Sequence, residues 1–274
     1  MGPSPHSSDL EQLRRQAKEL LKACRAGAPQ ARHRVAAQLP RVVRPDEEER
    51  LLLADALFVI ARERGFRSWP RLKTHLEKSR QRAERRASRQ RALHEQAATL
   101  VAAARQGDIA NVARQVSSIP LGSLLSIRAI IAASDDYRVV MDALIAGIEH
   151  PGPAIRYACA GAMDHLADAR CIGPLRRLLD DPVPRVRRMA LHALSCDACK
   201  LSPLPTDDDF VALAIERALH DPSIQVRRHA VAELSARCDD PRALQALTAI
   251  AARETDGAII RQVRWARREA ATGG

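Results

Sequence analysis

Apolar residues recur at intervals of three and four positions through most of the chain, which is the period of one face of an α-helix. Near the N-terminus this spacing predicts an amphipathic helix over residues 8–26, with Ser8 as its N-cap and Gly27 just beyond its end. Three further helices are expected over residues 30–38, from Asp46 to Gly65, and from Trp69 to about Glu77. Residues 1–77 therefore form a predicted helical module.

Two strings of this module resemble a known arrangement. They are LRRQAKELLKACRAG at 13–27 and LADALFVIARERGFRSWPRLKTHLE at 53–77. Together they resemble an N-terminal helical module that precedes ankyrin repeats in many bacterial proteins of unassigned function. The resemblance implies an architecture and no chemistry. We expect Phe66 and Trp69 to belong to the core of the module, where they hold the turn between two helices.

The segment after the module is strongly basic. Residues 71–91 have a net charge of +7, out of +11 for the whole chain, and residues 78–91 contain almost no apolar side chains. This segment cannot be core, so 78–91 is predicted to be a basic helical linker. It is either a solvated connector or an arm that contacts phosphates, and its candidate binding residues are Arg82, Arg85, Arg86 and Arg89. Connecting helices are expected over 92–136.

From residue 137 onwards the sequence repeats. When the chain is aligned with itself, His150-Pro151 with Ile155-Arg156 matches Asp181-Pro182 with Val186-Arg187, and both match Asp221-Pro222 with Val226-Arg227. A fainter copy follows, with Ile260-Arg261. Each copy predicts a helix A, a turn containing proline, and a helix B. The predicted pairs are 139–149 with 153–166, 172–179 with 184–194, 210–219 with 224–237, and 241–254 with 259–269.

This pattern is similar to that of the HEAT-repeat family, which has an aspartate in the turn and adjacent valine and arginine in helix B. One such pair of helices cannot bury both of its apolar faces, so the pairs stack around a continuous core. The resemblance implies an all-α fold with a right-handed α-solenoid over residues 137–274. It also implies an extended concave surface that binds a partner protein.

The turn residues of the repeats are expected to be structural. Charge-assisted hydrogen bonds should link adjacent turns through Asp181, Arg187, Asp221 and Arg227. His150 and Thr255 replace the aspartate in the first and fourth copies, so the intra-repeat ladder from aspartate to arginine is expected to be absent there. The arginines one position later, Arg188 and Arg228, are predicted to point off the ladder and to be available to a partner.

A cluster of cysteine and histidine departs from a plain repeat. His192, Cys196 and Cys199 are spaced i, i+4 and i+7, which places an imidazole and two thiols on one stripe of a helix. Zinc takes about four nitrogen or sulfur ligands in a tetrahedron, so these three could bind it with one neighbour. The repeat register offers His165, Cys171 and Cys238 as that neighbour. Buried or capping thiols are the main alternative, and disulfide redox chemistry is a further one.

Composition limits the classes of function. The chain has 274 residues, 46% of them apolar and only 3% aromatic, which favours helices that approach closely over small side chains. It has no membrane-spanning apolar run and no signal peptide, so we expect a cytoplasmic protein without membrane contacts. It also has no phosphate loop, nucleophile elbow or HExxH motif, which makes an enzyme the less favoured interpretation.

The leading functional prediction is a protein–protein interaction scaffold without catalysis. The net charge and the basic arm keep nucleic-acid binding open, and one family of alkylpurine DNA glycosylases is also built from HEAT-like repeats. However, base recognition uses aromatic platforms, and the repeat region has only Tyr137, Tyr157, Phe210 and Trp265. Bilin lyases use HEAT-like repeats too, so a metal-dependent or lyase-type protein is the third alternative.

Overall fold

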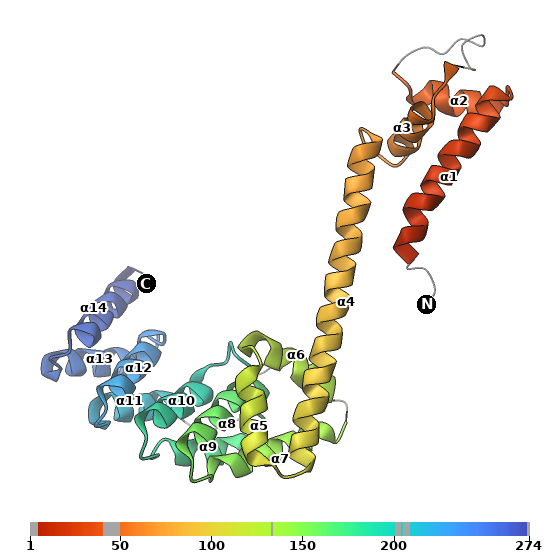
Figure 1. Cartoon of the computed structure of the whole chain (residues 1–274). Coiled ribbons are helices and arrows are strands. Elements are labelled where there is room, and N and C mark those ends of the chain that lie inside the picture. Colours follow the sequence, from red (N-terminus) through yellow and green to blue (C-terminus); the bar gives the residue numbers. More distant parts are fainter. Residues whose placement is uncertain (1–4, 41–49, 133, 201–203, 205–208, 273–274) are drawn as a thin grey trace. The chain divides into compact units, whose positions relative to one another are not determined.

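A computed structural model describes residues 5–40, 50–132, 134–200, 204 and 209–272. The described residues contain helices, turns and irregular segments, and no strand. The chain divides into two compact units, residues 1–90 and 91–274 (Figure 1). Helix α4 (Trp69–Arg105) contributes to both units. No helix within the described ranges is both long enough and apolar enough to cross a membrane.

Unit 1 is a small helical module. It contains α1 (Pro5–Arg25), α2 (Pro29–Gln38), α3 (Leu53–Glu63) and the first part of α4. The first helix begins at Pro5, so Ser8 lies inside it and is not its N-cap. Asp46, the predicted start of the third helix, lies outside the described residues. Phe66 and Trp69 are half-buried against the core of the unit, as expected.

Three glycines end helices in a left-handed conformation, which a residue without a Cβ adopts without strain. Gly27, Gly65 and Gly107 have φ values of 78°, 82° and 67°. After each one, the next amide donates to a carbonyl five positions earlier, for example from Phe66 to Ala61 at 2.9 Å. These are the helix ends that the sequence predicted.

Helix α4 differs from its predicted end near Glu77, because it continues to Arg105. The apolar period stops at that point, but the residues that follow are mainly Arg, Gln, Ala and Glu, which have high helix propensity. Ion pairs of Lys73 with Glu77 and of Arg80 with Glu84 add support at i, i+4 spacing. The segment 78–91 is therefore helical throughout and exposed along nearly its whole length.

Unit 2 is an all-α solenoid of stacked helix pairs. After α5 (Ile109–Ser118) and α6 (Leu121–Ile131), the four pairs are α7 (Asp136–Ile148) with α8 (Pro153–Leu166), α9 (Ile172–Leu178) with α10 (Pro184–Ser195), α11 (Phe210–His220) with α12 (Ile224–Ser235), and α13 (Pro241–Arg253) with α14 (Gly257–Thr272). Every predicted pair is present, and the B helices of the first three pairs start at the predicted residues.

One continuous core runs through unit 2, from Leu93 to Ala266. Helices α5 and α6 pack against α7 and α8 and belong to this core, so the segment expected to connect the two regions is part of the stack. Small residues let the helices approach closely: a Cβ at Gly147 of α7 would collide with the sulfur of Cys159 of α8. Alanine, leucine and valine fill most of the remaining core, in keeping with the low aromatic content.

A ladder of arginine–carboxylate pairs crosses the turns of the solenoid. Arg187 donates from Nε and Nη2 to the two carboxylate oxygens of Asp221, at 2.8 and 2.7 Å. Its Nη1 donates to the main-chain oxygen of Asp181, in its own turn, at 2.8 Å. Each arginine therefore binds the backbone of its own repeat and the carboxylate of the next repeat.

Arginine–carboxylate pairs between repeats also involve the two copies whose own turn lacks the aspartate. In the first copy Arg156 binds the carboxylate of Asp181 at 2.6 and 3.0 Å. Each such arginine–carboxylate pair, or rung, needs an acid in the turn of the following repeat and not in the turn of the arginine's own repeat. In the fourth copy Glu254, one residue before Thr255, accepts from Arg227 at 3.1 Å. These rungs join successive repeats, so they are not the intra-repeat pairs that were expected to be absent.

Candidate metal centre

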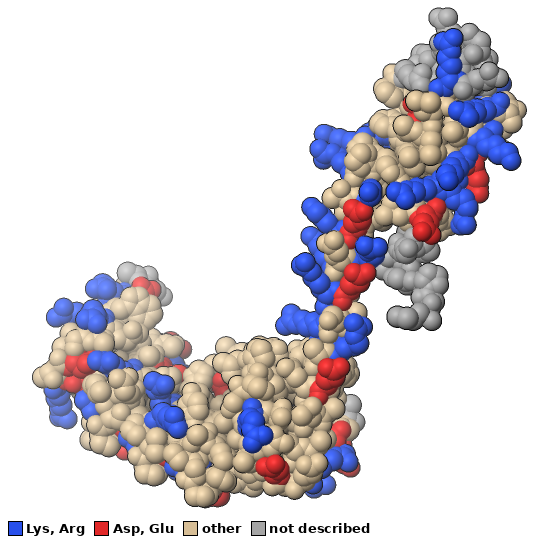
Figure 2. All heavy atoms as spheres, in the orientation of Figure 1, with Lys and Arg blue, Asp and Glu red and all other residues tan. Residues whose placement is uncertain are grey.

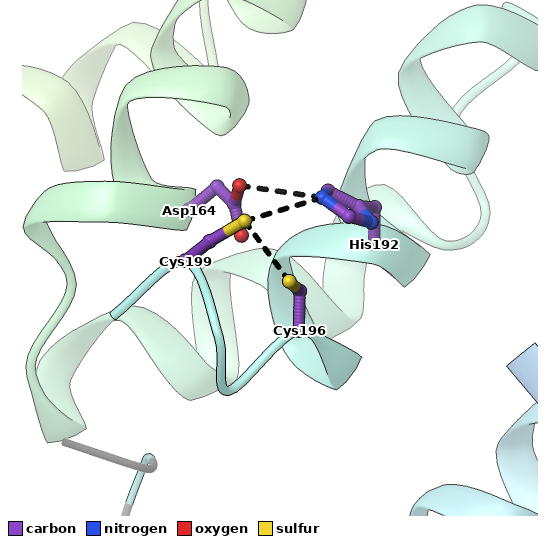
Figure 3. A group of neighbouring side chains, drawn as sticks. All are labelled: Asp164, His192, Cys196 and Cys199. Carbon is purple, nitrogen blue, oxygen red and sulfur yellow. Dashed lines mark hydrogen bonds and ion pairs between the residues drawn. The ribbon is translucent and has the colours of Figure 1, made fainter. Parts of the chain in front are cut away.

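Four potential metal ligands converge in the middle of the solenoid (Figure 3). Asp164 lies in the last turn of α8, His192 in the last turn of α10, Cys196 at the C-cap of α10, and Cys199 in the turn that follows. One ligand atom from each lies within 4.8 Å of all the others. The helix end at Cys196 bends the chain back, so that Cys199 returns over the carboxylate of Asp164.

The distances within the cluster are short. Nε2 of His192 lies 3.3 Å from Oδ2 of Asp164 and 3.8 Å from the sulfur of Cys199. The two sulfurs of Cys196 and Cys199 are 2.9 Å apart, and both thiols are free. His192, Cys196 and Cys199 were predicted to share one stripe of a helix. Helix α10 ends at Ser195, however, so Cys196 and Cys199 reach the cluster from the turn after the helix and not from its face.

None of the three expected neighbours is in the cluster. His165 turns its Nδ1 to the main-chain oxygen of Cys199, at 3.0 Å, and so supports the turn rather than the ligand set. Cys171 is fully buried in the apolar core, and burial raises the pKa of its thiol to about 11. The thiol of Cys238 donates to the main-chain oxygen of Ser235 at 3.0 Å.

The fourth member, Asp164, was not predicted as a ligand. The repeat register relates equivalent positions, and it pointed to His165 beside Cys196. Side chains of packed helices interdigitate, however, so contacts need not join equivalent positions. His192 contacts Asp164, which lies in the preceding repeat but not at the equivalent position. The adjacent pair Asp164-His165 was the available signal, but only the packing shows which of the two faces the thiols.

Charged side chains surround the cluster on its other sides. Lys200, whose side chain is fully buried, donates to the main-chain oxygen of Cys196 at 2.5 Å and lies 3.5 Å from Oδ1 of Asp164. Nδ1 of His192 lies 3.6 Å from Oε1 of Glu233 on α12. Glu233 in turn accepts from Arg237 at 3.0 Å and lies 3.5 Å from His229.

These contacts shift the protonation equilibria of the site. The carboxylates of Asp164 and Glu233 raise the pKa of His192 to about 10. Burial alone would raise the pKa of Glu233, but the hydrogen bonds to His192 and Arg237 outweigh it and bring the pKa to about 2. Burial, together with Cys196 and the carboxylate of Asp164, raises the pKa of Cys199 to about 12. The site therefore holds a protonated Cys199 thiol beside an imidazolium–carboxylate pair.

A shallow groove adjoins the cluster on the face formed by α10 and α12. It has a volume of about 490 Å³, and four of its seven lining residues are basic types, namely Arg188, His192, Arg228 and His229. Arg228 is not free as expected, because it forms a two-pronged pair with Asp256 at 3.0 and 2.5 Å. Arg188 is exposed and forms no ion pair within the described part of the chain.

The predicted basic arm presents an ordered stripe on α4. Arg82, Arg85, Arg86 and Arg89 are all exposed, and with Lys78 they fall within an arc of about 100° of the helix, over about 17 Å of its length. Both acidic residues of the segment, Glu77 and Glu84, lie on the opposite side and pair there with Lys73 and Arg80. The stripe thus lacks acidic partners among the described residues, and basic side chains line α4 in the space-filling view (Figure 2).

The comparison with known families agrees with this fold. A family model described as HEAT repeats matches residues 141–203, a stretch that contains all four members of the cluster. No curated protein matches the chain. The match supports the resemblance found in the repeats, while the resemblance of the N-terminal module stays a prediction. The chain contains an all-α solenoid whose central repeats match the HEAT-repeat family.

Proposed function

We propose that unit 2 is a protein-interaction module and that the groove between α10 and α12 binds an acidic segment of its partner. HEAT repeats commonly mediate contacts between proteins, and stacked helix pairs offer extended surfaces for them. The groove is the observation that carries the proposal. Four of its seven lining residues are basic types, and Arg188 is exposed and lacks an ion-pair partner among the described residues.

A photo-crosslinking amino acid at Gln225, an exposed residue of the groove, tests this proposal in the native host cell. We expect a discrete crosslinked protein, identified by mass spectrometry, whose binding weakens at least tenfold (about 1.4 kcal/mol) in the Arg188→Glu variant. Arg253→Glu is the matched control, because Arg253 is an exposed arginine at the end of α13, outside the groove. Equal binding by both variants would contradict the proposed groove.

The stripe on α4 supports a second function, which is contact with the phosphates of a nucleic acid. Arginine side chains on one helix face, without acidic neighbours, match the repeating charge of a phosphate backbone. With few aromatic residues available, such contacts would be electrostatic and largely independent of base sequence.

Fluorescence polarisation with a labelled duplex and a labelled single strand tests the second function at several salt concentrations. Changing Arg82, Arg85, Arg86 and Arg89 to Gln should weaken binding and lower the slope of log K against log salt by about 0.9 for each duplex phosphate that is no longer neutralised. The matched control changes Arg253, Arg261, Arg264 and Arg267 to Gln, which removes the same charge from exposed positions of α13 and α14. If both variants lose affinity equally, only net charge matters and the stripe is not a site.

A further inference from the structure

We propose that Asp164, His192, Cys196 and Cys199 form a zinc site that joins two successive repeats. The ligands come from the end of α8 in one repeat and from the end of α10 and the following turn in the next. Their donor atoms point toward one another in the close-up view (Figure 3). This inference is independent of the proposed partner groove, although His192 borders both.

The distances suit a tetrahedral ion. With bonds of about 2.3 Å to sulfur and about 2.0 Å to nitrogen or oxygen, the edges of the tetrahedron are about 3.3 Å between nitrogen and oxygen and about 3.5 Å between nitrogen and sulfur. The corresponding distances are 3.3 Å from His192 to Asp164 and 3.8 Å from His192 to Cys199. The two sulfurs, 2.9 Å apart, must separate by about 0.9 Å, and the remaining donor atoms lie within 4.8 Å of one another.

An unsatisfied buried atom is a second observation that points to a ligand. Asp164 is 4% exposed, yet its Oδ1 has no hydrogen bond within the described residues. The nearest cation to Oδ1 is the ammonium of Lys200, at 3.5 Å. A buried carboxylate oxygen without a hydrogen bond costs free energy, and a metal ion bound by this carboxylate would offset that cost.

The surroundings of His192 are those of a metal ligand. Its Nε2 faces the cluster and its Nδ1 faces Glu233, so the imidazole lies between the carboxylate of Glu233 and the proposed ion. Arg237 holds Glu233 in place through a hydrogen bond of 3.0 Å. When the ion displaces the proton from Nε2, Glu233 can keep the proton on Nδ1 and thereby fix the tautomer and orientation of the ring.

The charges also balance. Two thiolates, one carboxylate and a divalent ion leave one negative charge, and the buried ammonium of Lys200 neutralises it. Mixed sulfur, nitrogen and oxygen donors in a tetrahedron favour zinc over magnesium or calcium, which prefer oxygen alone. On binding, the ion takes up the lone pairs of both sulfurs, and their two protons and the proton of His192 leave to solvent.

Zinc titration of the full-length protein tests the site. Protein that has been reduced and stripped with a chelator should take up one equivalent of Zn²⁺ in competition with a chromophoric chelator. Co²⁺ in place of Zn²⁺ should give the visible bands of a tetrahedral ion and a thiolate charge-transfer band. Zinc should also raise the melting temperature of the unmodified protein, and chelator should reverse this rise, so this readout needs no variant.

Matched variants decide which residues bind the ion. Replacing Cys196 and Cys199 together by Ser should weaken zinc binding by more than about 100-fold, and Glu233→Gln, outside the ligand set, by about 10–100-fold. Cys238→Ser should bind like the unmodified protein, because the Cys238 thiol bonds to Ser235. Equal affinity in the double variant would overturn the proposal. The proposal would also be overturned if the reduced, chelator-stripped protein took up no zinc and Cys196 and Cys199 instead formed a disulfide on oxidation.

Discussion

Asp221 and Asp164 are both almost fully buried carboxylates of the same solenoid, but their surroundings differ. Asp221 accepts two hydrogen bonds from Arg187 and a third from the amide of Ser223, at 2.8 Å. Asp164 has one oxygen near His192 and another without a hydrogen bond among the described residues. Both carboxylate oxygens of Asp221 therefore have hydrogen-bond partners within the chain. Oδ1 of Asp164 has none among the described residues, and the proposed ion would supply a partner for this carboxylate. This contrast separates a structural polar group from a candidate binding site.

Removing Arg187 should have the largest effect on stability. Its guanidinium and the carboxylate of Asp221 are 8% and 0% exposed, so Arg187→Ala leaves a buried charge unpaired. We expect a loss of about 3–5 kcal/mol in the free energy of unfolding, measured by urea denaturation. A double-mutant cycle with Asp221→Ala should be strongly non-additive. Additive losses would mean that the two residues do not stabilise the fold as a pair.

The outer rungs should matter less, in the order of their burial. The side chains of Arg156 and Asp181 are 12% and 3% exposed, and those of Arg227 and Glu254 are 23% and 13% exposed. We expect losses of about 2 kcal/mol for Arg156→Ala and about 1 kcal/mol for Arg227→Ala in the same denaturation experiment. The reverse order would show that burial does not set the strength of the rungs.

Acid should weaken the ladder. Burial acts to raise the pKa of Asp181 and Asp221, but the hydrogen bonds from Arg156 and Arg187 outweigh it, so both pKa values lie below the usual range. Their contribution to stability is then complete above the unfolded pKa of about 3.9 and is lost as the pH falls through the lower folded values. Urea denaturation at decreasing pH should show this loss. Arg187→Ala should show a shallower dependence, and an unchanged slope would contradict the assignment.

The cluster should contribute least when no metal is bound. In the presence of chelator and reductant, Cys199→Ala should change the free energy of unfolding by less than about 1 kcal/mol, because this half-buried thiol makes only weak hydrogen bonds. The same substitution in zinc should abolish the stabilisation that zinc gives the unmodified protein. If Cys199→Ala in chelator lowered the free energy of unfolding as much as Arg187→Ala does, Cys199 would be a structural residue.

Much of the fold follows from local signals in the sequence. Pro153 and Pro184 mark the first residues of α8 and α10, because proline fits the first turn of a helix and interrupts what precedes it. The continuation of α4 past Glu77 does not follow from apolar periodicity, since propensity and charge pairs maintain it in solvent. Asp164 joins the cluster through the packing of α8 against α10. A single sequence shows the period of the repeats, but it does not show which side chains of neighbouring repeats are in contact.

The direction of the ladder has a consequence for cooperativity. Each rung joins the backbone turn of one repeat to the carboxylate of its neighbour, so its free energy belongs to the interface between repeats and to neither repeat alone. In a linear array, such nearest-neighbour coupling determines whether the units melt together or fray from an end. The rung from Arg187 to Asp221 is the most buried, so we expect it to couple the central repeats most tightly. The rung from Arg227 to Glu254 is the most exposed, so we expect fraying to begin at α13 and α14.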